Sequence, residues 1–387
     1  MLISYHEMKN PRSATDWRLS HQSAIIGAIS LLILHTIFKQ SPQQKPRGIT
    51  IYPQFKHLYN HDVYWELPTK SPPLGVLIFL HGCNHAAGDV FPQSTRCPKC
   101  LGLPEEQRTR KLAVNHHSLA VVAISSLQAT HEGKGCWDPQ HGTTPGQDDL
   151  SSVAAIIENL IADHEPQLQK LPIYALGVSS GGSLALLLPK VMQLAGICSQ
   201  IMAIYPQELE SVLNNSTRLQ QKEQHFKYPP TIFMHMPRDI HTASYVKQDV
   251  AALQSAHIPV EVAETAARPL TSKFLTLHSD GQISHNLAIG IVGALQLHNL
   301  LDTKGFLVND PRKSRGEWVK AVEPVTENFL SLEPDKSPLM TLMNVAFAGH
   351  EIITSGLDSA LKWLEHGGQG DLARWIHEEE MAEGLEA

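Results

Sequence analysis

The strongest constraint on the fold of this chain is the turn GVSSGG at residues 177–182. An apolar run of strand length, Leu171 to Gly177, precedes it, and an apolar helical stretch, Ser183 to Met192, follows it. A strand, a tight turn and a helix in that order expose the central serine, whose hydroxyl can then act as a nucleophile. The turn therefore predicts a nucleophilic Ser179, against the alternative that GxSxG arose by chance in a loop rich in Gly and Ser.

Apolar runs of strand length recur on both sides of this turn and alternate with longer amphipathic stretches. This alternation predicts an α/β fold in which a mostly parallel sheet is flanked by helices. The expected strands are Gly75 to His81, Leu119 to Ser126, Leu171 to Gly177, Ile197 to Tyr205, Pro230 to Met236 and Pro259 to Glu264. Together with the serine turn, these strands predict an α/β-hydrolase fold.

The expected helices fill the gaps between strands and then occupy the rest of the chain. Asp149 to Ala162, with acidic residues at its start, and Gln248 to Ala256 lie between strands. Beyond Glu264 only helices are expected: His285 to Leu301, Pro338 to His350 behind a Ser337 cap, and Gly356 to Leu364. This helical C-terminal region is expected to cap the site or to complete it.

The predicted organisation has five parts, of which the second is an apolar segment. They are a tail at 1–22, a membrane anchor at 23–38, a stalk with peripheral strands at 39–73, the α/β-hydrolase core at 74–265 and the helical region at 266–387. The anchor, Ser23 to Phe38, lacks charged residues, but at 1.5 Å per residue it spans about 24 Å, short of a bilayer core of roughly 30 Å. A signal peptide and a buried helix are the alternatives.

The flanks of this segment leave its orientation open, because basic residues lie on both sides. The expected location is a membrane, with a single pass, in the secretory pathway or a plastid. The net charge is only −7, and no basic stripe interleaved with aromatic residues occurs, so nucleic-acid binding is not expected. With 42% hydrophobic and 18% charged residues, the chain has ample material for a globular core.

A serine nucleophile needs donors for the oxyanion that forms on its substrate. The strand ending in LHGC, at 80–83, lies about 100 residues before Ser179, where hydrolases of this type place the loop that gives one donor. We therefore predict an oxyanion hole formed by Gly82 or Cys83 together with Ser180. The neighbouring His81, Asn84 and His85 are expected to shape the loop, since the fold draws its base from later in the chain.

The acid and the base should follow the nucleophile in that order. Asp239 comes just after the strand at 230–236 and is the predicted acid, although an aspartate there is often only a helix cap. Glu208 and Glu210 are the alternative acids. The candidate bases are His278, His285 and His350, of which His350 is preferred and His285 is the alternative.

The cysteines of the chain include four that fall in loops: Cys83, Cys97, Cys100 and Cys136. They could bind zinc or form two disulfides, and an oxidising compartment would favour disulfides. The overlapping sequons at Asn214 and Asn215 add slight support for a lumenal location.

The chain also resembles a family, the uncharacterised single-pass α/β-hydrolases of plants and algae. The resemblance covers most of residues 75–365. It is carried by HGCNH (81–85), CPKCLGLPEE (97–106), GKGCWD (133–138), YALGVSSGG (174–182), YPPTIFMHMPRD (228–239), GFLVNDPR (305–312) and NVAFAGHE (344–351). It implies a hydrolase-type fold, association with a secretory or plastid membrane, and a common framework for the four loop cysteines.

The predicted function is that of a serine hydrolase, similar to a carboxylesterase or lipase, that cleaves an ester or related acyl bond through an acyl-enzyme. An acyltransferase would use the same residues. The alternative class is a catalytically silent fold that serves as a small-molecule receptor or interaction module. The expected partners are a small acyl or ester substrate, lipid-like by fold analogy, and a membrane. No nucleotide cradle or dedicated metal motif occurs, so no cofactor is expected.

Overall fold

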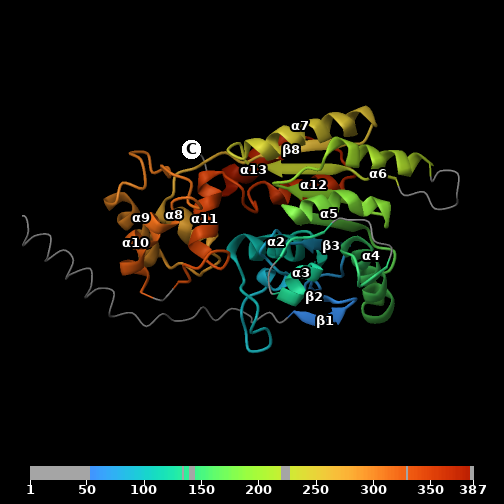
Figure 1. The fold of residues 1–387 in the computed structure, drawn as a ribbon, viewed down its shortest axis with the longest axis horizontal. Helices are drawn as coiled ribbons and strands as arrows, with labels where there is room; N and C mark the ends of the chain where they lie inside the picture. Colours follow the sequence, from blue (N-terminus) through green and yellow to red (C-terminus); the bar gives the residue numbers. More distant parts are fainter. Residues whose placement is uncertain (1–52, 133–134, 139–143, 219–226, 328–329, 384–387) are drawn as a thin grey trace, which may run out of the picture. The chain divides into compact units, whose positions relative to one another are not determined.

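The centre of the protein is one eight-stranded sheet (Figure 1). The computed structural model describes residues 53–132, 135–138, 144–218, 227–327 and 330–383. The strands are β1 Gln54–Leu58, β2 His61–Glu66, β3 Gly75–Leu80, β4 Leu119–Ile124, β5 Ile173–Val178, β6 Gly196–Gln200, β7 Thr231–His235 and β8 Val260–Glu264. Their order across the sheet is β1-β2-β4-β3-β5-β6-β7-β8.

Six of these strands run parallel, and the hairpin β1–β2 adds an antiparallel edge. Every residue of β3 and of β4 is buried, as both faces of a central parallel strand must be. The carboxyl ends of β5, β6 and β7 lie at the same edge of the sheet, because these strands pair in parallel. That edge is where α/β sheets bind their ligands.

Helices cover both faces of the sheet, and on each face helix and strand side chains together form a buried hydrophobic cluster. They are α2 Pro104–Asn115, α3 Leu127–Glu132, α4 Asp149–Asn159, α5 Ser180–Leu187, α6 Pro206–Arg218, α7 Ile240–Ser255, α8 Ser272–His278, α9 His285–Leu297, α10 Arg315–Thr326, α11 Pro338–Phe347, α12 Leu357–Glu365 and α13 Leu372–Glu383. The cluster on one face includes side chains of α4 to α7, and the other includes side chains of α2 and α8 to α13.

All six predicted strands are present, with ends that differ from the predictions by a few residues. The strand predicted at 197–205 ends at Gln200, since the chain then turns away from the sheet with Ile201 at φ 47°. The helix predicted at 248–256 is longer and begins at Ile240, because Asp239 caps it by accepting a hydrogen bond from the Thr242 amide. The mostly parallel sheet with helices on both faces and a serine turn after β5 is an α/β-hydrolase fold.

The predicted single-pass membrane location is corrected by the structure. Within the described ranges, which begin at residue 53, no helix is long and apolar enough to cross a bilayer. The segment Ser23 to Phe38, on which that prediction rested, lies outside the described residues. The predicted boundaries of the five parts stay predictions.

One buried carboxyl group gives the fold a testable dependence on pH. Asp249, in α7, is fully buried and accepts a hydrogen bond of 3.0 Å from the Ile204 amide. Burial raises the pKa of Asp249 from 3.8 to about 7, so the folded state holds its proton more tightly than the unfolded chain does. Stability should therefore fall as the pH rises from about 4 to about 7 through this group.

We expect Asp249→Asn to be more stable than the wild type at pH 8, and to gain less at pH 5, because the amide keeps the bond to Ile204 without a buried charge. A gain of roughly 1 kcal/mol would raise the melting temperature by about 1 °C in a chain of this length, which thermal unfolding at both pH values would detect. The exposed Asp163, changed to Asn, is the control and should show little effect. Equal shifts at pH 5 and pH 8 would contradict the assignment.

Candidate active site

Ser179 lies on a sharp turn between β5 and α5. Its backbone has φ 53° and ψ −120°, a conformation that costs a residue with a side chain about 1–3 kcal/mol and persists only where the surroundings enforce it. The surroundings include two glycines. A Cβ added to Gly177 would lie 2.0 Å from the Gly181 oxygen, and one added to Gly181 would lie 2.2 Å from the Leu80 oxygen. The turn is thus packed too closely for larger residues at either position.

His350 contacts both of the other residues predicted to act with it. Its Nε2 lies 2.9 Å from the Ser179 hydroxyl oxygen, and its Nδ1 lies 2.5 Å from an Asp239 carboxylate oxygen. A carboxylate accepts hydrogen bonds, so Nδ1 carries the proton and Nε2 is free to accept one from the serine. In this arrangement the imidazole can take the Ser179 proton while Asp239 holds it in the required tautomer.

Asp239 is both a helix cap and the hydrogen-bond partner of His350. The two interpretations from the sequence, helix cap and acid beside the base, are therefore compatible. One carboxylate oxygen accepts the Thr242 amide at 3.3 Å, and the other accepts His350. Burial favours the neutral acid, but the hydrogen bonds from His350 and Thr242 outweigh it and hold the pKa of Asp239 below its ordinary value. The group therefore stays ionised, as an acid that orients an imidazole must be.

The loop that carries His350 begins earlier than the sequence suggested. Helix α11 was expected to reach His350, yet it ends at Phe347, because Ala348 adopts a left-handed conformation with φ 58°. His350 is therefore a loop residue. The Arg238 amide donates to the Ala348 oxygen at 3.2 Å, which joins this loop to the one that carries Asp239.

A residue that the sequence did not reveal, Gln200, fastens the same loop to the sheet. Gln200 is fully buried at the end of β6; its side-chain amide donates to the Ile353 oxygen at 2.7 Å, and its side-chain oxygen accepts the Ile353 amide at 2.8 Å. Its backbone oxygen accepts the Ser179 amide at 2.9 Å. Gln200 thus connects the serine turn with the histidine loop. Its only signal in the sequence was a polar residue within an apolar strand.

The loop predicted to supply an oxyanion donor passes beside the serine. A Cβ added to Gly82 would lie 3.5 Å from the Ser179 Cβ, so Gly82 lies beside the serine, and Cys83 follows it directly in the chain. On the other side, Ser180 opens α5 directly after the nucleophile. Backbone amides at these positions can stabilise negative charge on a bound carbonyl oxygen.

His81 and His85 support this loop, as expected. His81 is buried; its Nδ1 donates to the Gly82 oxygen at 2.6 Å, and its Nε2 accepts the Ser126 amide at 2.9 Å. Burial lowers the pKa of His81 to about 4, which keeps it neutral in that role. Burial opposes a charge on His85 too, but the hydrogen bond to Asp89 and the nearby Glu106 together raise the pKa of His85 to about 10.

The other candidate acids and bases do not join the site. Glu208 and Glu210 are exposed in α6, where Glu208 accepts the Tyr205 amide. His285 is exposed at the start of α9, and none of the hydrogen bonds among the described residues connects it to Ser179 or Asp239. His278 is buried at the end of α8, where burial lowers its pKa to about 3.

The four loop cysteines form two disulfides, Cys83–Cys136 and Cys97–Cys100. Of the two alternatives left open by the sequence, zinc binding and disulfides, the structure has disulfides. Cys198 is buried and unpaired.

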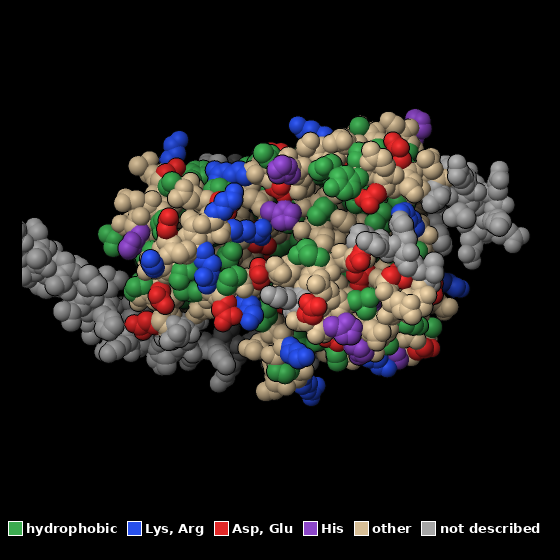
Figure 2. Space-filling view, viewed as in Figure 1, with side chains coloured by type: hydrophobic (Ala, Val, Ile, Leu, Met, Phe, Trp, Pro, Cys, Tyr) green, Lys and Arg blue, Asp and Glu red, His purple; other side chains and the backbone are tan. Residues whose placement is uncertain are grey.

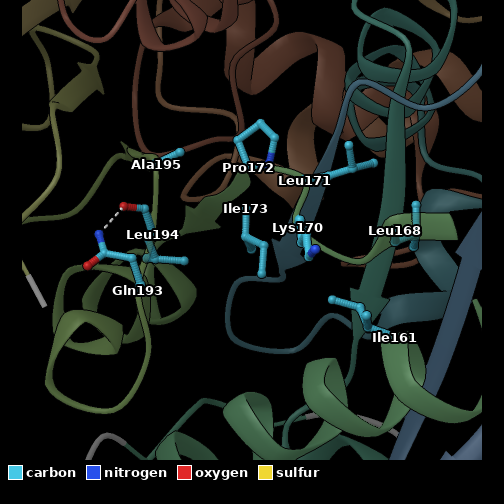
Figure 3. Close-up of a pocket in the computed structure, with 9 residues that line it drawn as sticks. All are labelled: Ile161, Leu168, Lys170, Leu171, Pro172, Ile173, Gln193, Leu194 and Ala195. Atoms are coloured by element: carbon cyan, nitrogen blue, oxygen red, sulfur yellow. Dashed lines mark hydrogen bonds between the residues drawn. The ribbon is translucent and has the colours of Figure 1, made fainter. Parts of the chain in front are cut away.

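Two hollows differ in their relation to the serine. One, of about 470 Å³, is lined by residues just before β5 and β6, from Lys170 to Ile173 and from Gln193 to Ala195, with Ile161 and Leu168 (Figure 3). It opens at the edge of the sheet opposite Ser179. The other, of about 590 Å³, includes Asn84, next to Cys83, and its lining carries the charged side chains Asp89, Glu132, Glu333, Asp335 and Lys336. Acidic and basic side chains are interspersed over the face drawn in Figure 2.

No family model and no curated protein matches this chain. Among solved structures it is similar to an open form of a lipase, with 10% identity, 56% of this chain and 90% of that chain covered, and a TM-score of 0.37. A carboxyl esterase from Bacillus coagulans has 11% identity, coverage of 57% and 91%, and a TM-score of 0.37. An acetyl xylan esterase from Aspergillus awamori has 14% identity, coverage of 54% of this chain and 83% of that chain, and a TM-score of 0.37. Likenesses this distant decide nothing about activity, and the fold assignment rests on the sheet and the serine turn.

Because the turn is closely packed, adding a single methyl group at Gly181 should destabilise the protein. Gly181→Ala should lower the free energy of unfolding by about 1–3 kcal/mol or more, since its Cβ would meet the backbone oxygens of Leu80 and His81. Gly293→Ala is the matched control, because Gly293 lies exposed in α9 with no atom within 4 Å of an added Cβ. We expect it to be neutral or stabilising, as alanine favours helices. Denaturant unfolding measures both; equal effects would contradict the packing argument.

A second prediction concerns Gln200. Gln200→Leu should destabilise the protein by about 1–3 kcal/mol, because it leaves the buried amide and oxygen of Ile353 without partners. Amide hydrogen exchange at Ile353 should accelerate well before global unfolding. Gln248→Leu, on the exposed face of α7, is the control and should change neither quantity. Unchanged exchange at Ile353 in Gln200→Leu would show that the loop is held by other contacts.

Proposed function

We propose that this protein is a serine hydrolase that cleaves an ester or related acyl bond through a Ser179–His350–Asp239 triad. The observation that carries the proposal is the position of the His350 ring, within hydrogen-bonding distance of Ser179 on one side and Asp239 on the other. The three residues come from three separate loops at one edge of the sheet. A scaffold without catalysis would not need this convergence.

In the proposed acylation step, His350 removes the proton from the Ser179 hydroxyl as its oxygen attacks the carbonyl carbon of the substrate. The carbonyl oxygen becomes an oxyanion, which the amides of Ser180 and of Gly82 or Cys83 stabilise. The imidazolium formed on His350 is balanced by ionised Asp239, and it then gives its proton to the leaving alcohol. Water, activated by His350 in turn, releases the acid from Ser179.

An acyltransferase would follow the same steps with an alcohol in place of water, so the triad alone does not separate the two activities. Hydrolysis is the simpler proposal because the His350 side chain is 34% exposed, which leaves it open to solvent. The silent receptor, the alternative class, is less favoured, since the His350 ring lies within hydrogen-bonding distance of both Ser179 and Asp239.

Neither of the two hollows has Ser179, Asp239 or His350 in its lining, so the triad alone defines the proposed substrate, as an ester or related acyl bond. A comparison of short-chain and long-chain nitrophenyl esters tests whether the substrate is lipid-like, as expected by analogy.

The deciding experiment is labelling of the full-length protein with a fluorophosphonate, which reacts with activated serines. We expect the wild type to be labelled, Ser179→Ala to be unlabelled, and His350→Ala to be labelled more slowly by a factor of about 10² or more, because it lacks the general base. His285→Ala is the matched control and should be labelled at the wild-type rate. Ester hydrolysis should follow the same order across the variants.

Two results would contradict the proposal. A folded wild type that neither reacts with the probe nor hydrolyses any ester would favour the silent receptor. Loss of labelling in His285→Ala, with labelling kept in His350→Ala, would show that the base is His285 and not His350. Circular dichroism of each variant separates these results from a failure to fold.

A further inference from the structure

One of the two disulfides ends at a proposed oxyanion donor. Cys83 follows Gly82, which lies beside Ser179, and it is bonded to Cys136, 53 residues later in the chain. The Asn84 amide donates to the Gly135 oxygen at 3.0 Å, next to the same bond. The oxyanion loop is therefore tied to the segment at 135–138 both covalently and by a hydrogen bond.

The segment at 135–138 also reaches the other proposed donor. The backbone amide of Trp137 lies 3.4 Å from the Ser180 hydroxyl, and its indole nitrogen donates to the His81 oxygen at 2.8 Å. One short segment thus contacts the residues on both sides of the proposed oxyanion hole.

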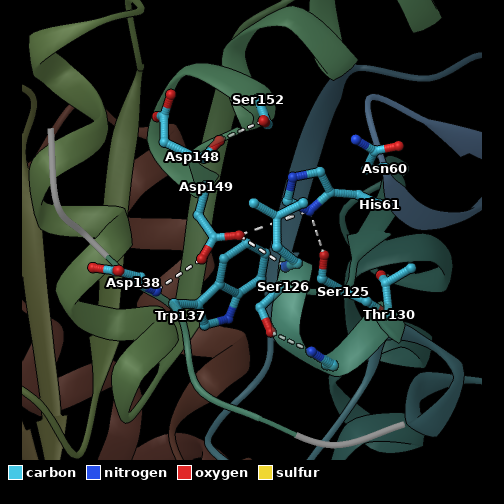
Figure 4. A network of polar contacts seen from close by, with 12 residues as sticks. Asn60, His61, Ser125, Ser126, Thr130, Trp137, Asp138, Asp148, Asp149 and Ser152 are labelled. Atoms are coloured by element: carbon cyan, nitrogen blue, oxygen red, sulfur yellow. Dashed lines mark hydrogen bonds and ion pairs between the residues drawn. The ribbon is translucent and has the colours of Figure 1, made fainter. Parts of the chain in front are cut away.

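Buried polar groups fix this segment in turn. A carboxylate oxygen of Asp149 accepts the Asp138 amide at 2.7 Å (Figure 4). The other carboxylate oxygen accepts the Leu127 amide at 2.9 Å. The Cys136 amide donates to the Gln128 side-chain oxygen at 3.1 Å. Asp149 and Trp137 are almost completely buried. These hydrogen bonds fix the backbone on both sides of the disulfide at Cys136.

The two disulfides differ in exposure. Cys136 is exposed and Cys83 is half-buried, whereas Cys97 and Cys100 are 4% and 0% exposed. A thiol reductant needs access to one sulfur, and exposed disulfides are the ones that are reduced most readily. A dithiol should therefore reach Cys83–Cys136 before Cys97–Cys100.

We propose that the Cys83–Cys136 disulfide positions the oxyanion hole, and that its reduction by a dithiol lowers the turnover of the enzyme. This inference rests on the proposed hydrolase function. Oxyanion donors act only when they lie at hydrogen-bonding distance from the developing charge, and loss of one donor costs about 10²–10³-fold in kcat. A donor that is loosened but retained should cost less.

The redox step needs a dithiol as its reductant. One thiolate attacks the sulfur of Cys136, the more exposed of the two residues. This step forms a mixed disulfide with Cys136 and releases the Cys83 thiolate, which takes up a proton. The second thiol then displaces Cys136 as a thiol and becomes part of the oxidised reductant. Two electrons pass from the dithiol to the protein disulfide, and air or an added disulfide reverses the change.

The test compares the full-length wild type, Cys136→Ala, and the double variant Cys97→Ala/Cys100→Ala, each before and after treatment with dithiothreitol. The substrate is a short nitrophenyl ester. In Cys136→Ala we expect kcat to fall by about 10-fold or more with little change in KM and an unchanged pH profile, because His350 and Asp239 keep their contacts. Dithiothreitol should lower kcat of the wild type to the same level, and reoxidation should restore it.

The double variant should keep the wild-type kcat and the same response to dithiothreitol, while Cys136→Ala should show no response. If wild type is active and Cys136→Ala retains kcat within a factor of two, the disulfide does not position the site. A shifted pH profile would locate the effect at the base and also overturn the inference. If Cys136→Ala does not fold, reduction of the folded wild type is the deciding test. An unchanged kcat, once the thiols of Cys83 and Cys136 are shown to be free by titration, refutes the proposal.

These outcomes differ from a failure of the proposed function. If the wild type neither hydrolyses esters nor reacts with a fluorophosphonate, the hydrolase proposal fails and the inference fails with it. If the wild type reacts with both and Cys136→Ala also behaves as the wild type does, the hydrolase proposal stands and the inference alone is rejected.

Discussion

The backbone conformation of Ser179 is the constraint on which the site depends. A residue at φ 53° and ψ −120° would relax if its neighbours allowed it, and the close packing of Gly177 against Gly181, and of Gly181 against Leu80, prevents this. The Gln200 oxygen accepts the Ser179 amide and fixes the turn to β6. The sheet thus holds the serine hydroxyl outward, where the other loops can meet it.

The same sheet edge explains how residues far apart in sequence reach one hydroxyl. Parallel pairing brings the carboxyl ends of β3, β5, β6 and β7 together, so each following loop begins close to Ser179. The histidine has no strand of its own, since its loop follows α11. Its position is instead set by Gln200, through Ile353, and by the bond between Arg238 and Ala348.

The sequence predicted well what local patterns encode. Apolar runs located all six parallel strands, since a strand buried on both faces must be apolar along its length. The chain order of the fold led to the three residues that the structure brings together, although His278 and His285 satisfied the same order as His350. The sequence misplaced the end of α11, since nothing in its composition signals the left-handed Ala348. It missed Gln200, whose partner lies 153 residues away.

Contacts across such distances also explain why the cysteine chemistry stayed open in the sequence. Zinc and disulfides use the same four residues, and only the approach of the loops decides between them. Here Cys83 and Cys136 have Cα atoms 4.2 Å apart, because Asp149 and Trp137 hold the segment at 135–138 against the oxyanion loop. The residues that shape the proposed oxyanion hole are therefore buried polar groups outside it. A mechanism read only from the triad would omit them, although in the proposed mechanism they position the amides that stabilise the oxyanion.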